Sequence, residues 1–480
     1  MRSVPRRRKL TSVLVIGSGL DHAGAVACRV FKAEGLRVTV VNGDPVSAMT
    51  DPESADATYV EPVTPETVEM VIAVERPNAL LPTVGGLDTA VALYESGALA
   101  RYGVELLRGL SRFSTNGAPV TELAMGHTLD ELRDDGTGKT PAHGEKTTGP
   151  EVVLLGAEFD LVPIVGTSTT ATSFELGVVD HTIDVDALYD GHELFLGGVL
   201  EHVGEGDSVC ALPPITLGRA DVVRIRESTG VVADRMEVRG LINVRYALVS
   251  GVLRVLKATP WAGRTVPFVS RATGVPLMKA AARIVLGSTI AELRAEGLLP
   301  AHGDGGSPPP DAAIAVRQSR FHGVDEVMGL GASFGPAYAK AQAAASTPLP
   351  TKGRAFVSVA NRDRRAMIFP VKTLADNGFE ILATSEIADL LHRNGVQATT
   401  VHPPIADRVL AGEVDLVVNT MHGQDDHDLR AAATTRGIPH VTTVQGLSAT
   451  VQGIEAINRG DTGIVSLQEH AAGLRRGRRA

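Results

Sequence analysis

The sequence VLVIGSG at residues 13–19 sets four apolar residues directly against a glycine turn. Apolar residues then recur at helical spacing, and a second apolar run spans residues 37–41. This order predicts a strand, a helix and a second strand parallel to the first, because parallel neighbours need a crossover connection. A second such unit follows, with a helix over residues 64–75, a short strand over 79–81 and a helix beginning near Asp88. The chain is therefore expected to begin with a doubly wound parallel sheet.

The glycines of this first turn raise the question of a dinucleotide site, because backbone amides at a helix N-terminus attract phosphate. Gly17, Gly19 and Gly24 give the spacing G-x-G-x-x-x-x-G. The dinucleotide fingerprint is G-x-G-x-x-G. A tight turn within the sheet is therefore the favoured interpretation, and a nicotinamide site is the minority alternative.

The composition is typical of a folded protein with several domains, since the 480 residues are 44% hydrophobic and 21% charged. A net charge of −9 and an aromatic content of 4% argue against binding to nucleic acid. The apolar run after the basic first nine residues is too short for a signal peptide, and no run is long enough to span a membrane. Cys28 and Cys210 lie among small apolar residues, so neither a disulfide framework nor a thiolate metal site is expected. The expected compartment is the cytoplasm.

The middle of the chain has the pattern of an antiparallel sheet. Gly, Thr, Asp and Lys cluster over residues 134–148 and predict a solvated connection. Strands are predicted over residues 152–155, 161–165, 184–188 and 194–200, and a hairpin over residues 240–249 and 251–256. An alanine-rich helix over residues 275–286 follows. The proline-rich stretch 304–311 is predicted as a linker, and an amphipathic helix is predicted over residues 335–344.

Residues 351–480 alternate strictly between strand and helix patterns. Strands are predicted over residues 355–359, 379–382, 414–418 and 440–443, and helices over residues 367–376, 387–393, 428–435 and 450–457. This alternation predicts a compact open parallel sheet, in which small ligands bind at the carboxyl ends of the strands. Here those ends are ATSE at residues 383–386 and NTM at residues 419–421.

Four longer stretches of sequence are more specific indicators of a protein family than the glycine pattern. They are MTDPESADATYVEP at 49–62, LPTVGG at 81–86, GDSVCALPP at 206–214 and RTVPFVS at 264–270. Together with residues 13–19, they resemble the large subunit of carbamoyl phosphate synthetase. The first two resemble the domain that precedes the first ATP-grasp module of that family, and the last two resemble its second module. From residue 353 onward the chain is similar to the methylglyoxal-synthase-like regulatory domain.

The resemblance implies that both ATP-grasp modules are incomplete. AMGHTLDEL at residues 124–132 resembles the segment after the first module, yet it follows closely after Gly86. VPIVGTS at residues 162–168 resembles the entrance to the second module, yet Asp184 comes almost at once. The lysine-bearing small lobe, which clamps adenine and phosphates in the family, has no room in either copy.

The expected fold class is therefore a multidomain α/β protein with five segments. They are a Rossmann-like pre-ATP-grasp domain at 1–110, a remnant of the first ATP-grasp module and a connection at 111–150, a remnant of the second pre-ATP-grasp and ATP-grasp module with an antiparallel sheet at 151–300, a linker and helix at 301–350, and a methylglyoxal-synthase-like open parallel sheet at 351–480.

The resemblance also locates the positions that hold magnesium in the family. They are a Gln in a pattern N-V-Q-F-A and a Glu and an Asn in a pattern E-V-N-P-R, which supply the oxygen ligands that a hard dication needs. Here the patterns read NVRYA and KATPW, so Arg245, Lys257 and Thr259 replace the three ligands. Trp261 replaces the arginine of the second pattern. Two cations about 4 Å apart repel by roughly 4 kcal/mol at an effective dielectric constant near 20, and they would also repel a dication.

One residue of the family's ATP-grasp constellation, Arg264, is retained. A stabilising role near the end of the sheet is the favoured interpretation for this arginine. No catalytic residue, metal site or cofactor is expected. ATP and magnesium enter only if the ligase activity is intact.

The C-terminal domain is closer to the family pattern. Hydroxyl and amide groups suited to a small phosphorylated effector stand at its strand ends, in Thr384, Ser385, Asn419 and Thr420. The family loop reads A-T-S-G-T-A, whereas here Glu386 replaces the glycine and Ile387 replaces the threonine, which removes a hydroxyl group. This carboxylate would lie beside the phosphate position, and it would also suit the N-terminus of a helix. An inherited loop without a ligand is therefore the alternative.

The favoured hypothesis is a shortened, internally deleted relative of this family that lacks ligase activity and has a regulatory-type, phosphate-binding domain. The alternative is an active enzyme that makes carbamoyl phosphate, a precursor of arginine and pyrimidines, from bicarbonate, glutamine-derived ammonia and ATP. A third hypothesis is a decayed product without a selected role. The resemblance implies a glutaminase small subunit or a full-length relative as partner, and neither nucleic acid nor a membrane is expected. Magnesium-dependent ATP binding separates the first two hypotheses.

Overall fold

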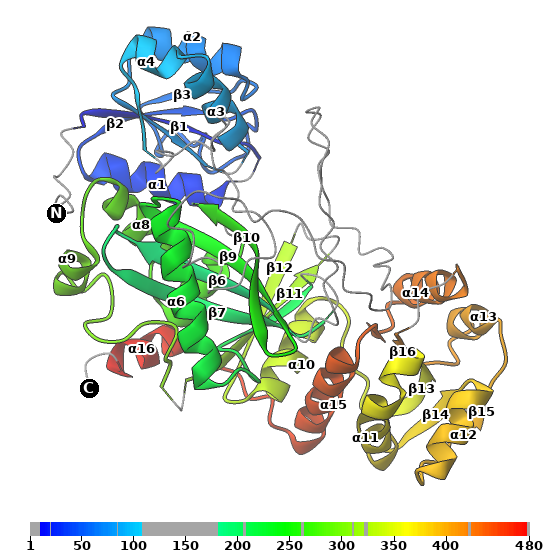
Figure 1. The fold of residues 1–480 in the computed structure, drawn as a ribbon. Helices are drawn as coiled ribbons and strands as arrows, with labels where there is room; N and C mark the ends of the chain where they lie inside the picture. Colours follow the sequence, from blue (N-terminus) through cyan, green and yellow to red (C-terminus); the bar gives the residue numbers. More distant parts are fainter. Residues whose placement is uncertain are drawn as a thin grey trace, which may run out of the picture.

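The computed structural model contains three β-sheets that follow one another along the sequence (Figure 1). The structure describes residues 10–19, 21–83, 85–107, 181–204, 208–260, 264–309, 312–320, 325–420 and 424–477. The connection and two strands predicted between residues 134 and 165 lie outside these ranges, as do Trp261 and the family-like stretches at 124–132 and 162–168. In the part of the chain that is described, no helix is both long enough and apolar enough to cross a membrane.

The first sheet is parallel, with the strand order β3-β2-β1-β4-β5. Its elements are β1 (Ser12–Ile16), α1 (His22–Ala33), β2 (Arg37–Val41), β3 (Ala57–Tyr59), α2 (Pro65–Glu75), β4 (Ala79–Pro82), α3 (Leu87–Glu95), α4 (Ala98–Tyr102) and β5 (Glu105–Leu106). Helix α1 begins where the Asp21 side chain caps it by accepting a hydrogen bond from the Gly24 backbone N–H at 2.8 Å. The predicted doubly wound opening is confirmed.

The second sheet is antiparallel, with seven strands in the order β10-β9-β6-β7-β8-β11-β12. Its strands and the helices around them are β6 (His181–Tyr189), β7 (Leu194–His202), β8 (Val209–Leu212), α6 (Arg219–Arg235), β9 (Gly240–Val249), β10 (Val252–Pro260), α7 (Val266–Thr273), α8 (Leu277–Val285), α9 (Ile290–Ala295), β11 (Ile314–Arg320), β12 (Asp325–Gly331) and α10 (Phe334–Ala344). Helices α7 and α8 cover one face, and α6 packs on the other. The predicted antiparallel sheet is present and forms a packed layer.

The structure differs from the prediction over residues 301–350. The sequence predicts a linker at residues 304–311 and a single helix after it. Strands β11 and β12 lie in this segment instead and extend the second sheet beyond β8. The predicted helix is present as α10, but most of its residues are buried, so it is not amphipathic. Burial on both sides explains why the sequence pattern of this helix is misleading.

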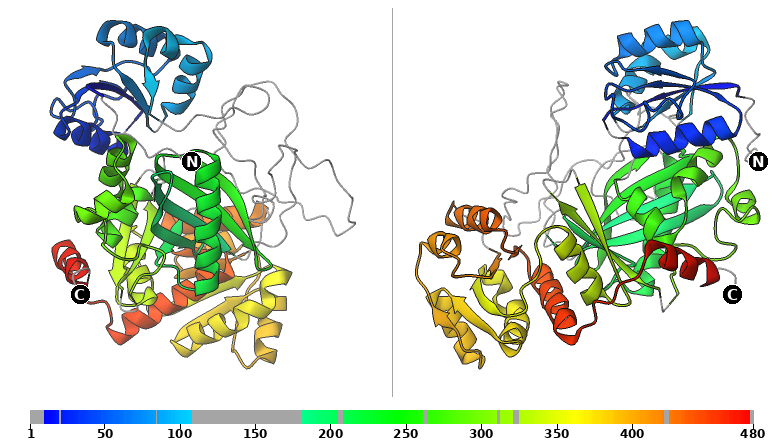
Figure 2. Two further views of the ribbon diagram at one scale, coloured as in Figure 1. Left: turned by 60° about the vertical axis from the view of Figure 1, so that its left-hand side comes forward. Right: turned by 180° about the vertical axis from the view of Figure 1, so that it is seen from behind.

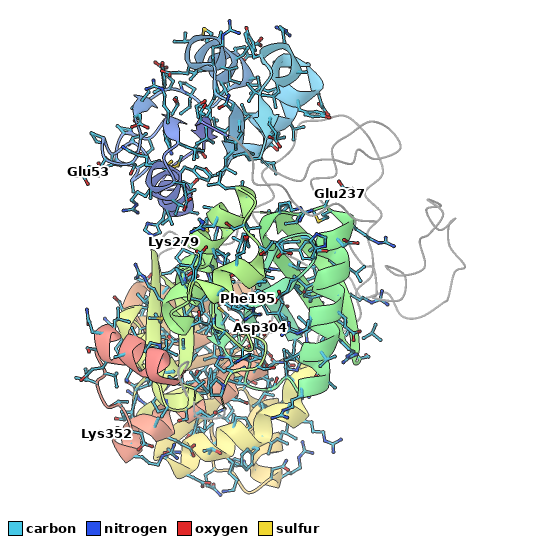
Figure 3. All side chains as sticks on the ribbon, turned by 90° about the vertical axis from the view of Figure 1, so that its left-hand side faces the viewer. Glu53, Phe195, Glu237, Lys279, Asp304 and Lys352 are labelled. Atoms are coloured by element: carbon cyan, nitrogen blue, oxygen red, sulfur yellow. The ribbon has the colours of Figure 1, made fainter. Side chains whose placement is uncertain are left out.

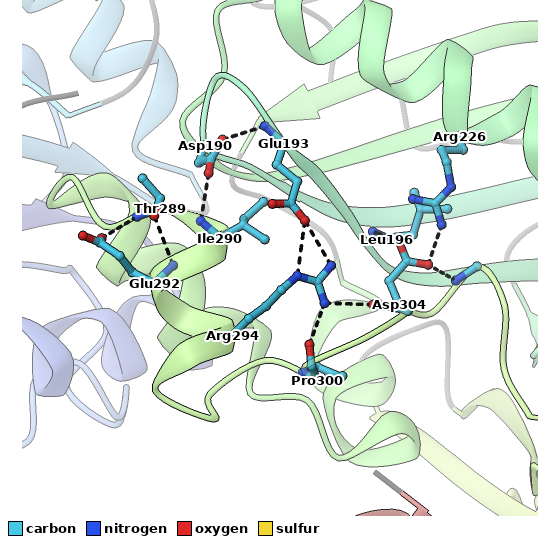
Figure 4. Close-up of polar contacts among 12 residues, drawn as sticks. Asp190, Glu193, Leu196, Arg226, Thr289, Ile290, Glu292, Arg294, Pro300 and Asp304 are labelled. Atoms are coloured by element: carbon cyan, nitrogen blue, oxygen red, sulfur yellow. Dashed lines mark hydrogen bonds and ion pairs between the residues drawn. The ribbon is translucent and has the colours of Figure 1, made fainter. Parts of the chain in front are cut away.

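The loop at residues 304–306 of the predicted linker packs closely against β7, where Asp304 contacts Leu196 (Figure 4). The Asp304 carboxylate accepts a hydrogen bond from the Leu196 backbone N–H at 3.2 Å and pairs with Arg226 at 2.5 Å. A Cβ atom at Gly305 would lie only 2.2 Å from the Gly197 carbonyl oxygen. Glycine is thus needed here for a close approach of two backbones, not for flexibility.

A second set of contacts, made by Arg294, holds the loop that leads to Asp304. The Arg294 guanidinium lies over the Phe195 ring, 5.2 Å from its centroid, and pairs with Glu193 at 3.1 Å. It also donates a hydrogen bond to the Pro300 carbonyl oxygen at 2.5 Å. Phe195 and Asp304 both belong to this layer (Figure 3), and Asp304 accepts its hydrogen bond from Leu196, the residue after Phe195. Arginine and aspartate side chains therefore fix a stretch whose composition resembles a linker.

The third sheet is parallel, with the strand order β15-β14-β13-β16-β17. Its elements are β13 (Gly353–Ser358), a short 3₁₀ turn (Asn361–Asp363), α11 (Arg364–Asp376), β14 (Phe379–Ala383), α12 (Ser385–Arg393), β15 (Thr399–Thr400), α13 (Ile405–Leu410), β16 (Leu416–Asn419), α14 (Gln424–Arg436), β17 (His440–Val441), α15 (Val444–Arg459) and α16 (Leu467–Gly477). The predicted open parallel sheet is confirmed. Helix α13 and the two-residue strand β15 are additional to the prediction.

Helices α10 and α15 lie side by side between the second and third sheets (Figure 2). One buried core runs from Val316 in β11 through Phe334 and Tyr338 in α10 to Leu447 and Ile454 in α15. The second and third sheets therefore share a hydrophobic core.

Two further contacts link the parts of the chain. Helix α1 packs against α8, where Arg283 pairs with Glu34 at 3.2 Å. The helix α16 contacts α7, which covers the second sheet, and there Nε2 of His470 lies 2.9 Å from the Ala272 carbonyl oxygen.

Candidate functional site

One face of the second sheet carries a row of charged residues, and the row includes two of the positions that the family pattern predicts as metal ligands. Lys257 of β10 lies opposite Arg245 of β9, which in turn lies opposite Asp184 of β6. Nε and Nη2 of Arg245 donate hydrogen bonds to Oδ1 and Oδ2 of Asp184 at 3.0 and 2.9 Å. Two such parallel hydrogen bonds make the strongest form of arginine–carboxylate pair. The guanidinium of Arg245 is thus bound to a carboxylate of its own chain.

Asp184 has a second partner in His202 of β7, whose Nε2 lies 2.9 Å from Oδ2 of Asp184. Both side chains are almost completely buried. Burial by itself raises the pKa of Asp184, but the hydrogen bonds with His202 and Arg245 outweigh it and hold this pKa well below its usual range. Asp184 is therefore an anion whose charge is matched within the sheet.

Asp186 lies on the same face of β6 and is completely buried. It accepts hydrogen bonds from Nδ2 of Asn243 at 2.9 Å and from the Thr265 hydroxyl at 2.6 Å. Burial raises the pKa of Asp186 to about 6, against the opposing effect of these two hydrogen bonds. Because Thr265 directly precedes α7, Asp186 ties the start of this helix to the sheet.

The row of polar side chains continues to β11. Nη1 of Arg317 pairs with Glu326 at 2.5 Å, and Nε of Arg317 donates a hydrogen bond to Sγ of Cys210 at 3.3 Å. Burial raises the pKa of Cys210 to about 12, so its thiol is not a nucleophile near neutral pH. Charges on this face are balanced by one another rather than directed at a ligand.

The structure places the residues predicted from the metal pattern as follows. Arg245 and Lys257 are neighbours, and Lys257 is exposed. Thr259 lies opposite Asn243 in the register. The retained Arg264 is also exposed, just before the buried Thr265. Across the described ranges, no three His, Cys, Asp or Glu side chains gather closely enough to hold a metal ion.

Sequence reasoning missed Asp184 and Asp186, which organise this face. A signal was present in the predicted strand 184–188, because two aspartates at alternate positions of a strand point to the same face. A buried strand with two carboxylates on one face needs buried donors close by. Arg245 is one of those donors.

The loops at the carboxyl edge of the first sheet pack closely on one another. The strand order of this sheet puts the switch point between β1 and β4, where a dinucleotide would bind. A Cβ atom at Gly85 would lie 1.8 Å from Oγ of Ser18, and one at Gly86 would lie 2.5 Å from the Ile16 carbonyl oxygen. The loop after β4 thus packs on the first glycine turn, and the Asp21 carboxylate caps the helix where a phosphate would sit. Both observations support the tight-turn interpretation.

The third sheet brings the four predicted effector residues to one edge. Val357 of β13 lies opposite Ala383 of β14 on one side and opposite Val418 of β16 on the other. Thr384 and Asn419 each follow one residue later, at the carboxyl ends of their strands. Thr384 is the N-cap residue of α12, Ser385 begins that helix, and Thr420 follows Asn419.

The buried members of this set already have carboxylate partners. Nδ2 of Asn419 donates a hydrogen bond to Asp426 at 2.7 Å. The Thr420 hydroxyl donates to Asp363 at 2.6 Å and accepts from the Ala360 backbone N–H at 3.0 Å. The sequence pattern had not indicated either aspartate as part of the site.

Glu386 also has a partner that sequence reasoning missed. Its Oε2 lies 2.5 Å from Nη2 of Arg364, the first residue of α11. The signal for Arg364 was the run NRDRR at residues 361–365, which is separated from the end of β13 by two residues, at the edge where ligands of parallel sheets bind. The candidate effector site therefore contains an arginine and three carboxylates besides the four predicted residues.

Three family models match the chain. The model described as carbamoyl phosphate synthase preATP-grasp domain matches residues 10–112, and the MGS-like domain matches residues 366–442. The model described as carbamoyl-phosphate synthase L chain, ATP binding domain, matches residues 198–293. Among solved structures, the biotin carboxylase domain of a single-chain bacterial carboxylase matches with a TM-score of 0.43 and 18% identity, over 64% of this chain and 74% of that chain.

Curated relatives match along almost the whole chain. The carbamoyl phosphate synthase large chain of Streptomyces coelicolor is 43% identical over 548 residues, which cover 97% of this chain and 49% of the relative. The protein of the same name from Mycobacterium tuberculosis is 39% identical over 549 residues, with 95% and 48% covered. The chain thus spans about half the length of the curated relatives it matches. Because the aligned span is longer than the 480 residues of this chain, the relatives carry residues within that span that have no counterpart here. The chain belongs to the carbamoyl phosphate synthase large-chain family and carries an MGS-like domain in its C-terminal part.

Proposed function

We propose that this chain does not synthesise carbamoyl phosphate and that it acts as a non-catalytic binding member of its family. The observation that carries this proposal is the pair between Arg245 and Asp184 on the face where the family pattern has oxygen ligands. Magnesium needs several oxygen ligands around it, and a guanidinium at that position repels a dication. The donor set of this face therefore does not fit magnesium.

Restoring the family ligands would not rebuild the site by simple substitution. Arg245 is one of the two side chains that neutralise the buried Asp184. Replacing it with Gln would leave a buried carboxylate with one partner fewer, which is costly. Arg245 therefore stabilises the fold. The dependence of the buried Asp184 on this arginine supports the proposal that the chain has adapted to the loss of its metal.

The incomplete ATP-grasp pattern gives independent support. The relatives carry residues within the aligned span that this chain lacks, and the family's small lobe has no counterpart in the sequence pattern. Phosphoryl transfer depends chiefly on positioning and on shielding of the reacting groups, so a missing lobe removes a large part of the catalysis. A reaction that needs ATP is not expected from such a chain.

The binding role is assigned to the C-terminal domain. Its sheet edge combines Thr384 and Ser385 at the start of α12 with Arg364, and these donors suit a small phosphorylated effector. Asn419 and Thr420 lie beside them and are held by Asp426 and Asp363. A full-length relative or a glutaminase small subunit is the protein partner that the family suggests. Family membership alone favours the second candidate, an active ligase that uses ATP, magnesium and glutamine-derived ammonia.

The test is bicarbonate-dependent ATP hydrolysis by the purified chain, with magnesium and ammonia supplied. We expect no hydrolysis above a heat-inactivated control and no magnesium-dependent binding of ATP. An intact large chain of the family is the positive control under the same conditions. Hydrolysis that needs bicarbonate and is abolished by a chelator would refute this proposal and establish the ligase.

A further inference from the structure

We propose that Glu386 of the chain itself occupies the anion position of the C-terminal site, so that a phosphate must displace this carboxylate in order to bind. The inference rests on the proposed effector function of the same site and concerns its regulation. It assigns to Glu386 the role of an internal competitor.

The position of Glu386 is the first observation. It lies in the first turn of α12, a helix of nine residues, where the backbone N–H groups and the helix dipole favour a negative charge. Its Oε2 lies 2.5 Å from Nη2 of Arg364, which begins α11. The two helices follow β14 and β13, which are direct neighbours in the sheet. Glu386 is therefore placed between two features that both attract a phosphate.

The second observation concerns Nε of Arg364, an N–H donor that the contact with Glu386 does not use. Nε of Arg364 is buried and has no hydrogen-bond partner among the described residues. An arginine that binds a phosphate or a carboxylate in the bidentate manner uses two N–H groups. Glu386 occupies Nη2, so this contact leaves Nε for a ligand. A buried donor without a partner is rare, so a phosphate that displaces Glu386 would have both Nη2 and Nε of Arg364 to bind.

Two other side chains of the site also contact carboxylates of the chain itself. Asn419 and Thr420 donate hydrogen bonds to Asp426 and Asp363. These carboxylates satisfy the donors and keep the site in order without a ligand. Of the three carboxylates, Glu386 is the one that replaces a glycine of the family loop, so it is the one whose removal restores that pattern.

The contact is weak enough to be displaced. Glu386 is 74% exposed and Arg364 is 35% exposed, and pairs so open to water contribute little. Glu386 therefore acts as a competitor that weakens binding, not as a permanent block. Its removal should tighten phosphate binding by roughly tenfold, because a neighbouring like charge and a competing partner disappear together.

The experiment uses the full chain and inorganic phosphate as the probe, at constant ionic strength. Binding is measured by calorimetric titration and by the shift in melting temperature. We expect Glu386→Gln to bind phosphate about tenfold more tightly than the wild type. Glu413→Gln is the matched control, because it removes another exposed pair of the same domain, Arg408–Glu413 at 2.8 Å, and should leave the affinity unchanged. In the double variant Arg364→Gln/Glu386→Gln the gain should be lost.

Three other outcomes of the titrations would contradict the inference. Equal and measurable affinities of the wild type and Glu386→Gln would overturn the inference and leave the proposed effector function standing. Binding by neither protein would overturn both. A gain that persists in the double variant would show that phosphate does not use Arg364, and it would overturn the inference as well.

Discussion

Asp186 is a buried carboxyl group whose protonation affects the stability of the fold. Its pKa of about 6 in the folded chain lies above the value of about 4 for an aspartate in an unfolded chain. The folded state therefore binds the proton more tightly, so the stability from this group is complete below pH 4 and is lost as the pH rises through 6. The neighbouring Asp184 has a lowered pKa, so its contribution is present above about pH 4 and is lost only in more acidic solution.

We expect Asp186→Asn to stabilise the protein at neutral pH. The amide is uncharged like the protonated carboxyl group, and it keeps an oxygen for Asn243 or Thr265. The free energy of unfolding should exceed that of the wild type by about 3 kcal/mol at pH 7.5, and the difference should vanish near pH 4. Urea denaturation at several pH values measures it. A difference that does not change with pH would contradict this account of Asp186.

Helix α10 packs across the domain boundary that the sequence predicts. The sequence predicts a boundary at residue 351, because the alternation of strands and helices begins there. The hydrophobic core of the third sheet nevertheless includes Phe334 and Tyr338, and the Tyr338 hydroxyl lies 3.3 Å from that of Thr450 in α15. A Cβ atom at Gly335 would lie 2.5 Å from the Gln452 carbonyl oxygen, so the two helices touch through their backbones. Periodicity cannot indicate which neighbour a buried helix has.

We therefore expect a fragment of residues 333–480 to be more stable than a fragment of residues 351–480. The longer fragment keeps the side chains of α10 against α15, and their loss should cost about 3–5 kcal/mol. Gly335→Leu in the longer fragment is the control, because its side chain would push the two helices apart. Chemical denaturation of the three proteins gives the comparison. Equal stabilities of the two unsubstituted fragments would place the boundary back at residue 351.

The sequence predicts the course of the chain through its three sheets well but the state of its sites only in part. Alternation and periodicity indicate most strands, and the family pattern identifies Arg245 and Lys257 as substitutions at the metal position. The pairing of Arg245 with Asp184 could not be predicted, because it depends on which strands become neighbours. The bond between Thr420 and Asp363 likewise joins two loops that are distant in sequence. Composition also misleads where glycine serves close packing, as at Gly305.

The continuous core between the second and third sheets predicts that they lose their structure together. It joins Val209 and Val316 of the second sheet, through α10 and α15, to Ala355 and Val357 of the third. A helix buried between two layers transmits the loss of one layer to the other, because neither keeps its apolar face covered alone. The first sheet contacts the layer of the second sheet through α1, which packs against α8. The opposite face of the first sheet, covered by α2 and α3, has a separate hydrophobic core.

We expect Tyr338→Ala to speed hydrogen exchange in both sheets at once. The tyrosine is 5% exposed, and its removal should cost about 3–5 kcal/mol. Amides of β8 and β11 should then exchange faster together with those of β13 and β16, whereas β1 and β2 should change little. Leu80→Ala, in the outer core of the first sheet, is the matched control and should affect that sheet alone. Faster exchange confined to the third sheet in Tyr338→Ala would show that the two sheets unfold separately, and the C-terminal domain would then be an independent unit despite its shared core.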